Sequence, residues 1–183
     1  MQTYISILRG INVGGHNKVD MAGLKTMYQE LGFKEIISYI QSGNIIFQSD
    51  PHLPPNDLAK VIKEAILSKF KLTVPVIIRS IDEMQKVIEK NPFLKMADID
   101  AEKLHVTFLA EEPVSEKVQL IAEADYSPDR FIIVDREVFL NCPSGYGNTK
   151  LNNTFFESKL KTAATTRNWK TVNKLFELAT SIA

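Results

Sequence analysis

The order of the expected strands and helices constrains the fold of this 183-residue chain more than any other feature of its sequence. Stretches rich in β-branched residues alternate with stretches whose apolar residues recur every three or four positions, the patterns of strands and amphipathic helices. Asp20 suits the N-cap of the first helix, and Gly32 suits its end. The elements expected before residue 81 are strands at 3–9, 34–40, 44–48 and 74–80 and helices at 21–31 and 55–70. This order predicts the split βαβ, or ferredoxin-like, arrangement.

The second half of the chain begins to repeat that order. The expected elements are strands at 103–110, 130–135 and 137–141 and helices at 115–124, 151–161 and about 169–180. No strand is expected after the helix at 151–161, so the second copy is predicted to be a degenerate βαββαα unit with an extra C-terminal helix. The chain is thus predicted to be α/β (α+β), with ferredoxin-like subdomains at 1–81 and 103–183. A connecting helix and linker are expected at 82–102.

The residues suited to redox or metal chemistry are few. A single cysteine, Cys142, excludes an internal disulfide and a Cys-rich zinc module. His16, His52 and His105 are scattered and lack metal-ligand spacing. Because nothing in the sequence places a base beside Cys142, we expect an unreactive thiol. The N-terminus lacks a signal-peptide pattern and no apolar run approaches the ~20 residues of a membrane span, so we expect a cytoplasmic protein without membrane association.

Charge is balanced overall but unevenly distributed along the chain. There are 22 basic and 22 acidic residues in total. Residues 82–142 hold 7 basic and 14 acidic residues, and residues 143–183 hold 6 and 2. Proteins that bind extended duplex DNA need a basic surplus to neutralise phosphates, so this distribution argues against such a partner. It permits one compact anion site, and it says nothing about oligomeric state.

The first candidate site is the glycine-containing loop between the first strand and the first helix. Glycines at such a turn let backbone N–H groups face an anion. Gly10 and Gly15 have the spacing of P-loop glycines, but His16 and Asn17 stand where that motif needs Lys and Ser/Thr, so nucleotide hydrolysis by that mechanism is not supported. The candidate ligand-binding residues are Arg9, Asn12, Gly14, Gly15 and Lys18. The alternative is that the glycines serve only a tight turn.

The second candidate site is the tip of the first hairpin, Gln41-Ser42-Gly43-Asn44. Its candidate ligand-binding residues are Ser42 and Asn44. We expect this hairpin at the sheet end opposite the first loop, so the two segments need not share a site. Ordinary turn chemistry also favours Ser, Gly and Asn here.

The third candidate site combines residues 143–150 with residues 165–169, each placed before a predicted helix. Its candidate residues are Gly145, Gly147, Lys150 and Arg167. A cation at a helix N-terminus opposes the helix dipole, unless an anion lies between them. Lys150 and Arg167 therefore favour a bound anion at this site. Trp169 is in register with Val172 and Leu175 and is predicted to belong to the core.

Four segments together resemble the signature of a bacterial family catalogued as a conserved domain of unknown function. They are YISILRGINVGG at 4–15, YIQSGN at 39–44, Gly145-Tyr146-Gly147 with Lys150-Leu151, and TTRNW at 165–169. The resemblance runs from Met1 to about Leu178. It implies a small cytoplasmic bacterial protein with a two-part α/β fold. It implies no reaction, so no catalytic residue, cofactor or metal is assigned.

Three functions remain open from the sequence. The first is binding of a phosphorylated or otherwise anionic small molecule, such as a nucleotide, at the glycine-rich segments. The second is binding of single-stranded nucleic acid between the subdomains. An RNA-recognition platform is disfavoured because Ser42 and Asn44 stand where stacking aromatics belong. The third is a protein-interaction module without a ligand.

Overall fold

The computed structural model describes residues 1–183 and divides into two compact units. The first unit comprises Met1–Lys86 together with Lys174–Ala183, and the second comprises Val87–Asn173. Each unit contains one four-stranded antiparallel sheet. In the first unit the C-terminal segment returns to β3 (Asn44–Ser49), where the Gln48 side-chain amide donates to the carbonyl of Ile182 at 2.5 Å.

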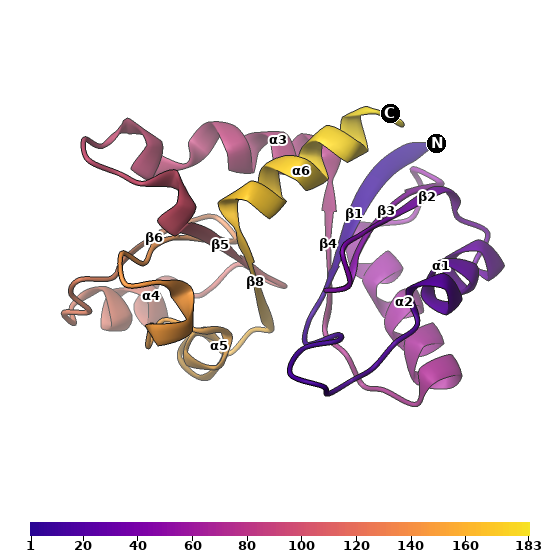
Figure 1. Cartoon of the computed structure of the whole chain (residues 1–183), viewed down its shortest axis with the longest axis horizontal. Helices are drawn as coiled ribbons and strands as arrows, with labels where there is room; N and C mark the ends of the chain where they lie inside the picture. The colour runs from indigo at the N-terminus through magenta and orange to yellow at the C-terminus, as the bar shows by residue number, and fades with distance from the viewer. The chain divides into compact units, whose positions relative to one another are not determined.

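The first unit has the predicted ferredoxin-like topology. Its elements are β1 (Gln2–Leu8), α1 (Met21–Glu30), β2 (Lys34–Tyr39), β3, α2 (Pro55–Phe70) and β4 (Val76–Ser80), followed by α3 (Ile81–Lys90). The strand order is β2-β3-β1-β4. Figure 1 shows α1 and α2 on one face of this sheet. That face carries Tyr4, Leu8 and Phe47, which pack with Leu24 of α1 and Ile62 of α2 into one buried core.

Local chemistry fixes the ends of α1. The Asp20 carboxylate accepts hydrogen bonds from the backbone N–H groups of Ala22 and Gly23, as expected of an N-cap. After the helix, Gly32 adopts a φ of +82°, a conformation that glycine takes without steric cost.

The second unit has the same order of elements. They are β5 (Leu104–Leu109), α4 (Ser115–Ala122), β6 (Arg130–Val134), β7 (Glu137–Asn141), α5 (Asn153–Leu160) and β8 (Ala164–Asn168). The last helix, α6 (Trp169–Thr180), begins in this unit and ends in the part of the first unit that starts at Lys174. Short 3₁₀ turns lie at Pro92–Lys95, Ala101–Lys103 and Tyr146–Asn148. The strand order is β6-β7-β5-β8. Leu109, Leu140 and Ala164 of the sheet pack with Ile121 of α4 and Phe156 of α5.

The two ferredoxin-like subdomains and the C-terminal helix are confirmed, but β8 was not expected and corrects the predicted degeneracy. Residues 164–168 form an edge strand that pairs with β5, so the second unit has all four strands. Its sequence, Ala164-Thr165-Thr166-Arg167-Asn168, lacks the apolar alternation of a strand, and the side chains of Thr166 and Arg167 make polar contacts. Predicting strands from apolar patterns therefore missed it.

Backbone hydrogen bonds recur at matching positions in the two units. Leu8 N–H donates to the carbonyl of Gly43 at 2.8 Å, and Leu109 N–H donates to the carbonyl of Arg136 at 2.9 Å. The next residue of each strand repeats the pattern, from Arg9 to Pro75 and from Ala110 to Ala163. The units therefore share strand register as well as topology.

An arginine occupies the same position in the last strand of each sheet. Arg79 pairs with Ile5 across the sheet, and Arg167 pairs with Val106. Each guanidinium donates through Nη1 to the carbonyl of the residue before it, at 2.9 Å in both cases. Arg79 is only 1% exposed, so this cation is taken out of water by the fold.

None of the helices combines the length and the apolar character that crossing a membrane requires.

Gly43 and Gly15 form a matched pair that tests the packing of the hairpin tip. Both have positive φ, +75° and +80°. A Cβ at Gly43 would lie 2.7 Å from the Cβ of Leu8, whereas a Cβ at Gly15 would meet nothing within 4 Å. Gly15→Ala should therefore cost only the left-handed strain of about 1–2 kcal/mol. Gly43→Ala should cost a further ~1–3 kcal/mol through overpacking. Urea unfolding of the two variants checks this, and equal losses would contradict the close packing.

Candidate functional site

The loop after β1 and the tip of the β2–β3 hairpin lie together at one end of the first sheet. β3 is antiparallel to both β1 and β2, so these two strands run in the same direction and end on the same side. The Asn12 side-chain amide donates to the carbonyl of Gln41 at 2.9 Å, and Leu8 N–H donates to the carbonyl of Gly43 at 2.8 Å. The expectation that the hairpin lies at the opposite end is therefore wrong. The first two candidate segments form one cluster, which we call the loop–hairpin cluster (residues 9–20 and 40–44).

Asn12 holds this cluster together. Its backbone is left-handed, with φ of +55°. Its side chain accepts from Val19 N–H at 2.8 Å and donates to the carbonyl of Val19 at 3.0 Å, in addition to its bond with Gln41. At the hairpin, the buried Asn44 amide donates to the carbonyl of Tyr39 and to the Ser42 hydroxyl. Asn12 and Asn44 therefore stabilise the loop–hairpin cluster. A ligand-binding role for them stays a prediction.

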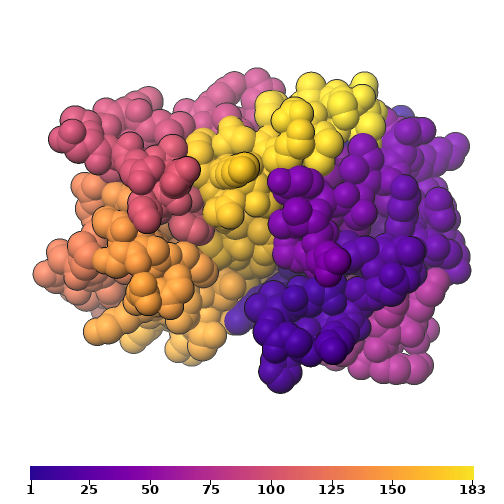
Figure 2. Space-filling model, in the orientation of Figure 1, coloured from indigo at the N-terminus to yellow at the C-terminus, as the bar shows by residue number.

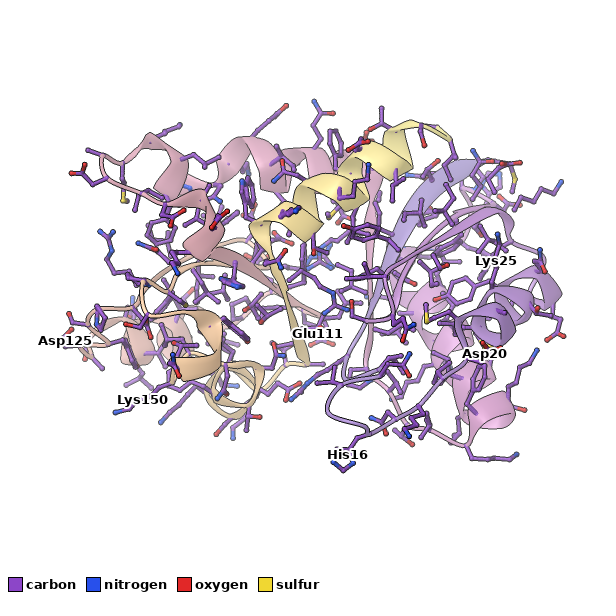
Figure 3. All side chains as sticks on the ribbon, in the orientation of Figure 1. His16, Asp20, Lys25, Glu111, Asp125 and Lys150 are labelled. Carbon is purple, nitrogen blue, oxygen red and sulfur yellow. The ribbon has the colours of Figure 1, made fainter.

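The loop has an unusual concentration of left-handed backbone. Positive φ values occur at Gly10, Asn12, Gly14, Gly15 and Asn17. The backbone–backbone hydrogen bonds within the loop run from Asn12 N–H to the carbonyl of Asn17 and from His16 N–H to the carbonyl of Val13, and neither uses the N–H of Gly14 or Gly15. Figure 2 shows the indigo N-terminal residues at the surface of this unit, and Figure 3 places His16 at the tip of the loop. Both glycine amides are thus exposed donors.

A hollow of about 350 Å³ lies within the loop–hairpin cluster. Its walls include the predicted residues Asn12, Gly15 and Lys18, together with Gln41 of the hairpin. Asp20 also lines the hollow, but its carboxylate already accepts from the first amides of α1. The N-terminus of α1 is therefore occupied by the protein's own carboxylate. Gln41 was not among the candidates, because the hairpin was placed at the wrong end.

The aromatic residues of the central strands β1 and β3 offer no platform for nucleic-acid bases. Tyr4 and Phe47 lie on the helix-covered face, 2% and 0% exposed, with their rings stacked 5.9 Å apart. Rings that stack on bases must be accessible. This agrees with the argument from sequence against an RNA-recognition platform.

In the second unit, two of the candidate segments meet around Thr166 of β8. The Tyr146 hydroxyl donates to Thr166 Oγ1 at 3.0 Å, and the ring of Tyr146 stacks on His105 at 4.8 Å. Thr166 donates its only hydroxyl proton to Asn153 Oδ1, so Thr107, 2.7 Å away, must donate to it. Thr166 therefore takes part in three hydrogen bonds. We call this set the Thr166 cluster.

Lys150 and Arg167, the two predicted cations, lie in different surroundings. Arg167 lies on β8, where its Nη1 donates to Thr165 Oγ1 and to the carbonyl of Thr166, and burial lowers its pKa to about 10. It therefore remains charged at neutral pH. Lys150 is exposed and lines a separate hollow of about 200 Å³ with Asp125 and Asp129. Figure 3 shows Lys150 and Asp125 on the same edge of the unit.

Lys150 and Arg167 come shortly before α5 and α6, but asparagines cap both helices. Asn152 caps α5 by accepting from Phe155 N–H, and Asn168 accepts from Thr171 N–H at the start of α6. Gly145 and Gly147 lie at the 3₁₀ turn between β7 and α5. Gly145 is left-handed, with φ of +90°, and donates to the carbonyl of Cys142. Gly145 thus has a conformational reason to be glycine, and the binding role of both glycines stays a prediction.

Two titratable groups of the second unit are shifted by burial. Burial raises the pKa of the Cys142 thiol to about 11, with the charge of Asp129 adding to the effect. The thiolate is therefore scarce at neutral pH. Burial also lowers the pKa of His105, whose Nδ1 lies 3.2 Å from the carbonyl of Lys103. His105 is therefore neutral at pH 7.

Comparisons with known proteins agree with the fold. A family model described as "Protein of unknown function (DUF1697)" matches residues 1–139. Among solved structures, the conserved bacterial protein SP0830 from Streptococcus pneumoniae is similar, with a TM-score of 0.71 and 25% sequence identity. The similarity covers 97% of this chain and 98% of that one. No curated protein matches the chain.

Thr166→Val should test the Thr166 cluster. Valine keeps the shape of threonine but loses three hydrogen bonds, which at roughly 1 kcal/mol each predicts a loss of about 2–3 kcal/mol in the free energy of unfolding. Thr26→Val is the control, because the Thr26 hydroxyl makes a single exposed bond to the carbonyl of Ala22. Urea denaturation measures both. Comparable losses in the two variants would show that the cluster adds no stability.

The lowered pKa of His105 predicts a pH dependence of stability. Folding favours the neutral ring, so this contribution is fully present above the unfolded-state pKa of about 6.5 and decreases as pH falls below it. We expect the free energy of unfolding to fall from pH 7 to pH 5, and His105→Gln to reduce that slope. His16→Gln, at the exposed loop tip, should leave it unchanged. An unaltered slope in His105→Gln would contradict the assignment.

Proposed function

The chain belongs to the DUF1697 family of proteins of unknown function, and from the geometry of its first unit we propose that it binds a phosphorylated or otherwise anionic small molecule, such as a nucleotide. The ligand would occupy the hollow of the loop–hairpin cluster. Lys18 would supply the charge, and the amides of Gly14 and Gly15 would supply hydrogen bonds.

The observation that carries this proposal is the pair of exposed glycine amides next to a lysine. Successive backbone N–H groups in a turn form concavities that bind anions in many proteins. Gly14 and Gly15 are successive residues of such a turn, both with positive φ, and Gly15 lines the same hollow as Lys18. Asn12 and Gln41 fix the wall of the hollow through their mutual hydrogen bond. A pre-formed wall reduces the entropy lost on binding.

Electrostatics favours the first unit over the second as the anion site. Lys150 shares its hollow with two carboxylates, Asp125 and Asp129, which repel an anion. In the first unit the single carboxylate, Asp20, is neutralised in part by the two amides it accepts from. The glycines around Lys150 therefore support binding less well than those around Lys18.

Lys18→Gln and Lys25→Gln are the variants that test this proposal. Both lysines are exposed, but Lys25 lies on α1 and is absent from the lining of the hollow. With ATP, a sugar phosphate and inorganic phosphate as probes, we expect Lys18→Gln to weaken binding about fivefold, since an exposed ionic contact contributes up to ~1 kcal/mol. Lys25→Gln should bind like the unmodified protein. Isothermal titration calorimetry gives the affinities.

Nuclear magnetic resonance on the same samples locates the ligand. The amide signals of Gly14 and Gly15 should shift on titration, while those around Lys150 stay in place. Equal weakening in the two lysine variants, or shifts confined to the second unit, would refute the proposal. Binding of oligonucleotides without binding of mononucleotides would favour single-stranded nucleic acid instead. No binding of any probe would leave a protein-interaction module as the better reading.

A further inference from the structure

The outer side of the edge strand β6 is unpaired. The strand order β6-β7-β5-β8 gives β6 a single neighbour, and no hydrogen bond joins its outer backbone groups to another segment. Its sequence, Arg-Phe-Ile-Ile-Val, contains four consecutive apolar residues that are all partly exposed, whereas the apolar residues of β7 are buried. An exposed apolar edge is a template on which a further strand can pair.

The other three edge strands lack this combination. In β2 the register shifts between Lys34 and Ile37, and the strand begins with exposed charged residues, two features that discourage pairing. The residues of β4 are buried after the first one. The residues of β8 are polar after Ala164. β6 is therefore the edge best suited to accept another strand.

The hairpin turn determines which backbone groups of β6 face outward. A two-residue loop joins β6 to β7, and the residues that flank it, Val134 and Glu137, are paired. Residues that flank such a loop exchange hydrogen bonds with each other, and along the strands bonded pairs alternate with non-bonded pairs. Ile132 therefore also bonds to β7. Phe131 and Ile133 turn their N–H and C=O groups away from the sheet.

A hollow of about 290 Å³ lies along this edge. Phe131 packs into the core beneath the helices, so the alternation of a strand turns Ile132 to the opposite face. Because both residues line the hollow, it runs beside the strand rather than over one face. Ala122 at the end of α4 and Met96, which is 40% exposed, also line it. An added strand would meet apolar side chains as well as unpaired backbone groups.

The surroundings of β6 are acidic. Residues 123–137, which contain the strand, hold five acidic and two basic residues. The chain as a whole has no net charge, so this excess is local. Only one of these carboxylates, Asp135, forms an ion pair, an exposed one with Lys90 at 3.1 Å. Complementary charge favours an added strand whose ends are basic.

A second copy of β6 fits this edge less well than a basic segment does. The outward groups of two antiparallel copies make the most hydrogen bonds when Phe131 of one lies opposite Ile133 of the other. That register also places Asp129 opposite Asp135, once on each side of the pair. Like charges directly opposite each other destabilise a pair of strands. The charge of the edge therefore favours a different chain.

We propose that β6 binds an extended segment of another protein by strand addition, and that this segment is apolar with lysine or arginine at its ends. Its backbone bonds to the outward N–H and C=O groups of Phe131 and Ile133. Its side chains pack against the hollow, and its basic ends lie near the carboxylates of residues 123–137. This binding is additional to the anion binding proposed for the first unit and uses none of the same residues.

Two peptides titrated into the full chain test the partner's chemistry. One is a capped peptide, Lys-Thr-Val-Thr-Val-Thr-Val-Lys, and the other has glutamate in place of both lysines. Fluorescence anisotropy of the labelled peptides gives the affinities. We expect saturable binding of the lysine peptide, at least about fivefold tighter than the glutamate peptide, because exposed ionic contacts contribute up to ~1 kcal/mol each. The difference should shrink at high salt.

Hydrogen exchange tests the mode of binding on the unmodified protein. In the free chain, the outward amides of Phe131 and Ile133 should exchange faster than those of Ile132 and Val134, which bond to β7. Saturation with the lysine peptide should slow exchange at Phe131 and Ile133 by about tenfold or more. Nuclear magnetic resonance resolves the individual amides. Peptide binding that leaves the two outward amides unprotected would contradict strand addition.

Ile133→Pro and Ile133→Ala form a matched pair of variants. Both lose the isoleucine side chain, but only proline removes the outward N–H. Proline is tolerated on an edge strand where the N–H faces solvent. The proline variant should bind the lysine peptide at least about tenfold more weakly than the alanine variant, because a ladder bond is lost and the ring obstructs the added strand. Should the proline variant not fold, the exchange measurement decides.

Four results would overturn the proposal. The first is the absence of saturable binding of the lysine peptide, and the second is equal affinity for the two peptides. The third is equal affinity in folded Ile133→Pro and Ile133→Ala. The fourth is a stable dimer in light scattering whose outward amides are protected without peptide, which would make a second copy the occupant. None of these results depends on Lys18, so they are distinguishable from a failure of the anion proposal.

Discussion

The position of β3 between β1 and β2 determines where the loops of the first unit lie. Because β3 is antiparallel to both neighbours, β1 and β2 finish at the same end of the sheet. The loop after β1 and the hairpin after β2 are thereby held within hydrogen-bonding distance, as the Asn12–Gln41 bond shows. The hollow beside Lys18 depends on this constraint, since one wall comes from each segment.

The same scaffold carries different loops in its two copies. The backbone bonds of Leu8 and Leu109 to their hairpins are equivalent, yet the loop after β1 spans residues 9–20 while the loop after β5 spans only 110–114. The second unit instead has its long connection between β7 and α5, where Tyr146 reaches Thr166. The two units therefore share their strand register but have their long polar connections at different strand ends, after β1 in the first unit and after β7 in the second.

The sequence predicted most of the strands and helices but few of the contacts at the candidate sites. Strands and helices with an apolar face were found because their patterns are local, and the Asp20 cap was found from its residue type. β8 was missed because hydroxyl and guanidinium groups replace the apolar alternation, and only pairing with β5 makes it a strand. The contact between the loop after β1 and the β2–β3 hairpin could have been predicted from the sequence, because the directions of the strands place both at the same end of the sheet. The contacts of Thr166 with Tyr146 and Thr107 could not, because they join segments distant in sequence.

The first unit is discontinuous in sequence, since it is completed by residues 174–183, whereas the second unit is one continuous stretch. A ribosome releases the chain from its N-terminus, and domains fold as their residues emerge. The second unit therefore has all its residues available before the first unit does. The portion of the protein that is synthesised first is the last to be finished, and until then Gln48 lacks the carbonyl of Ile182 that it binds in the complete chain.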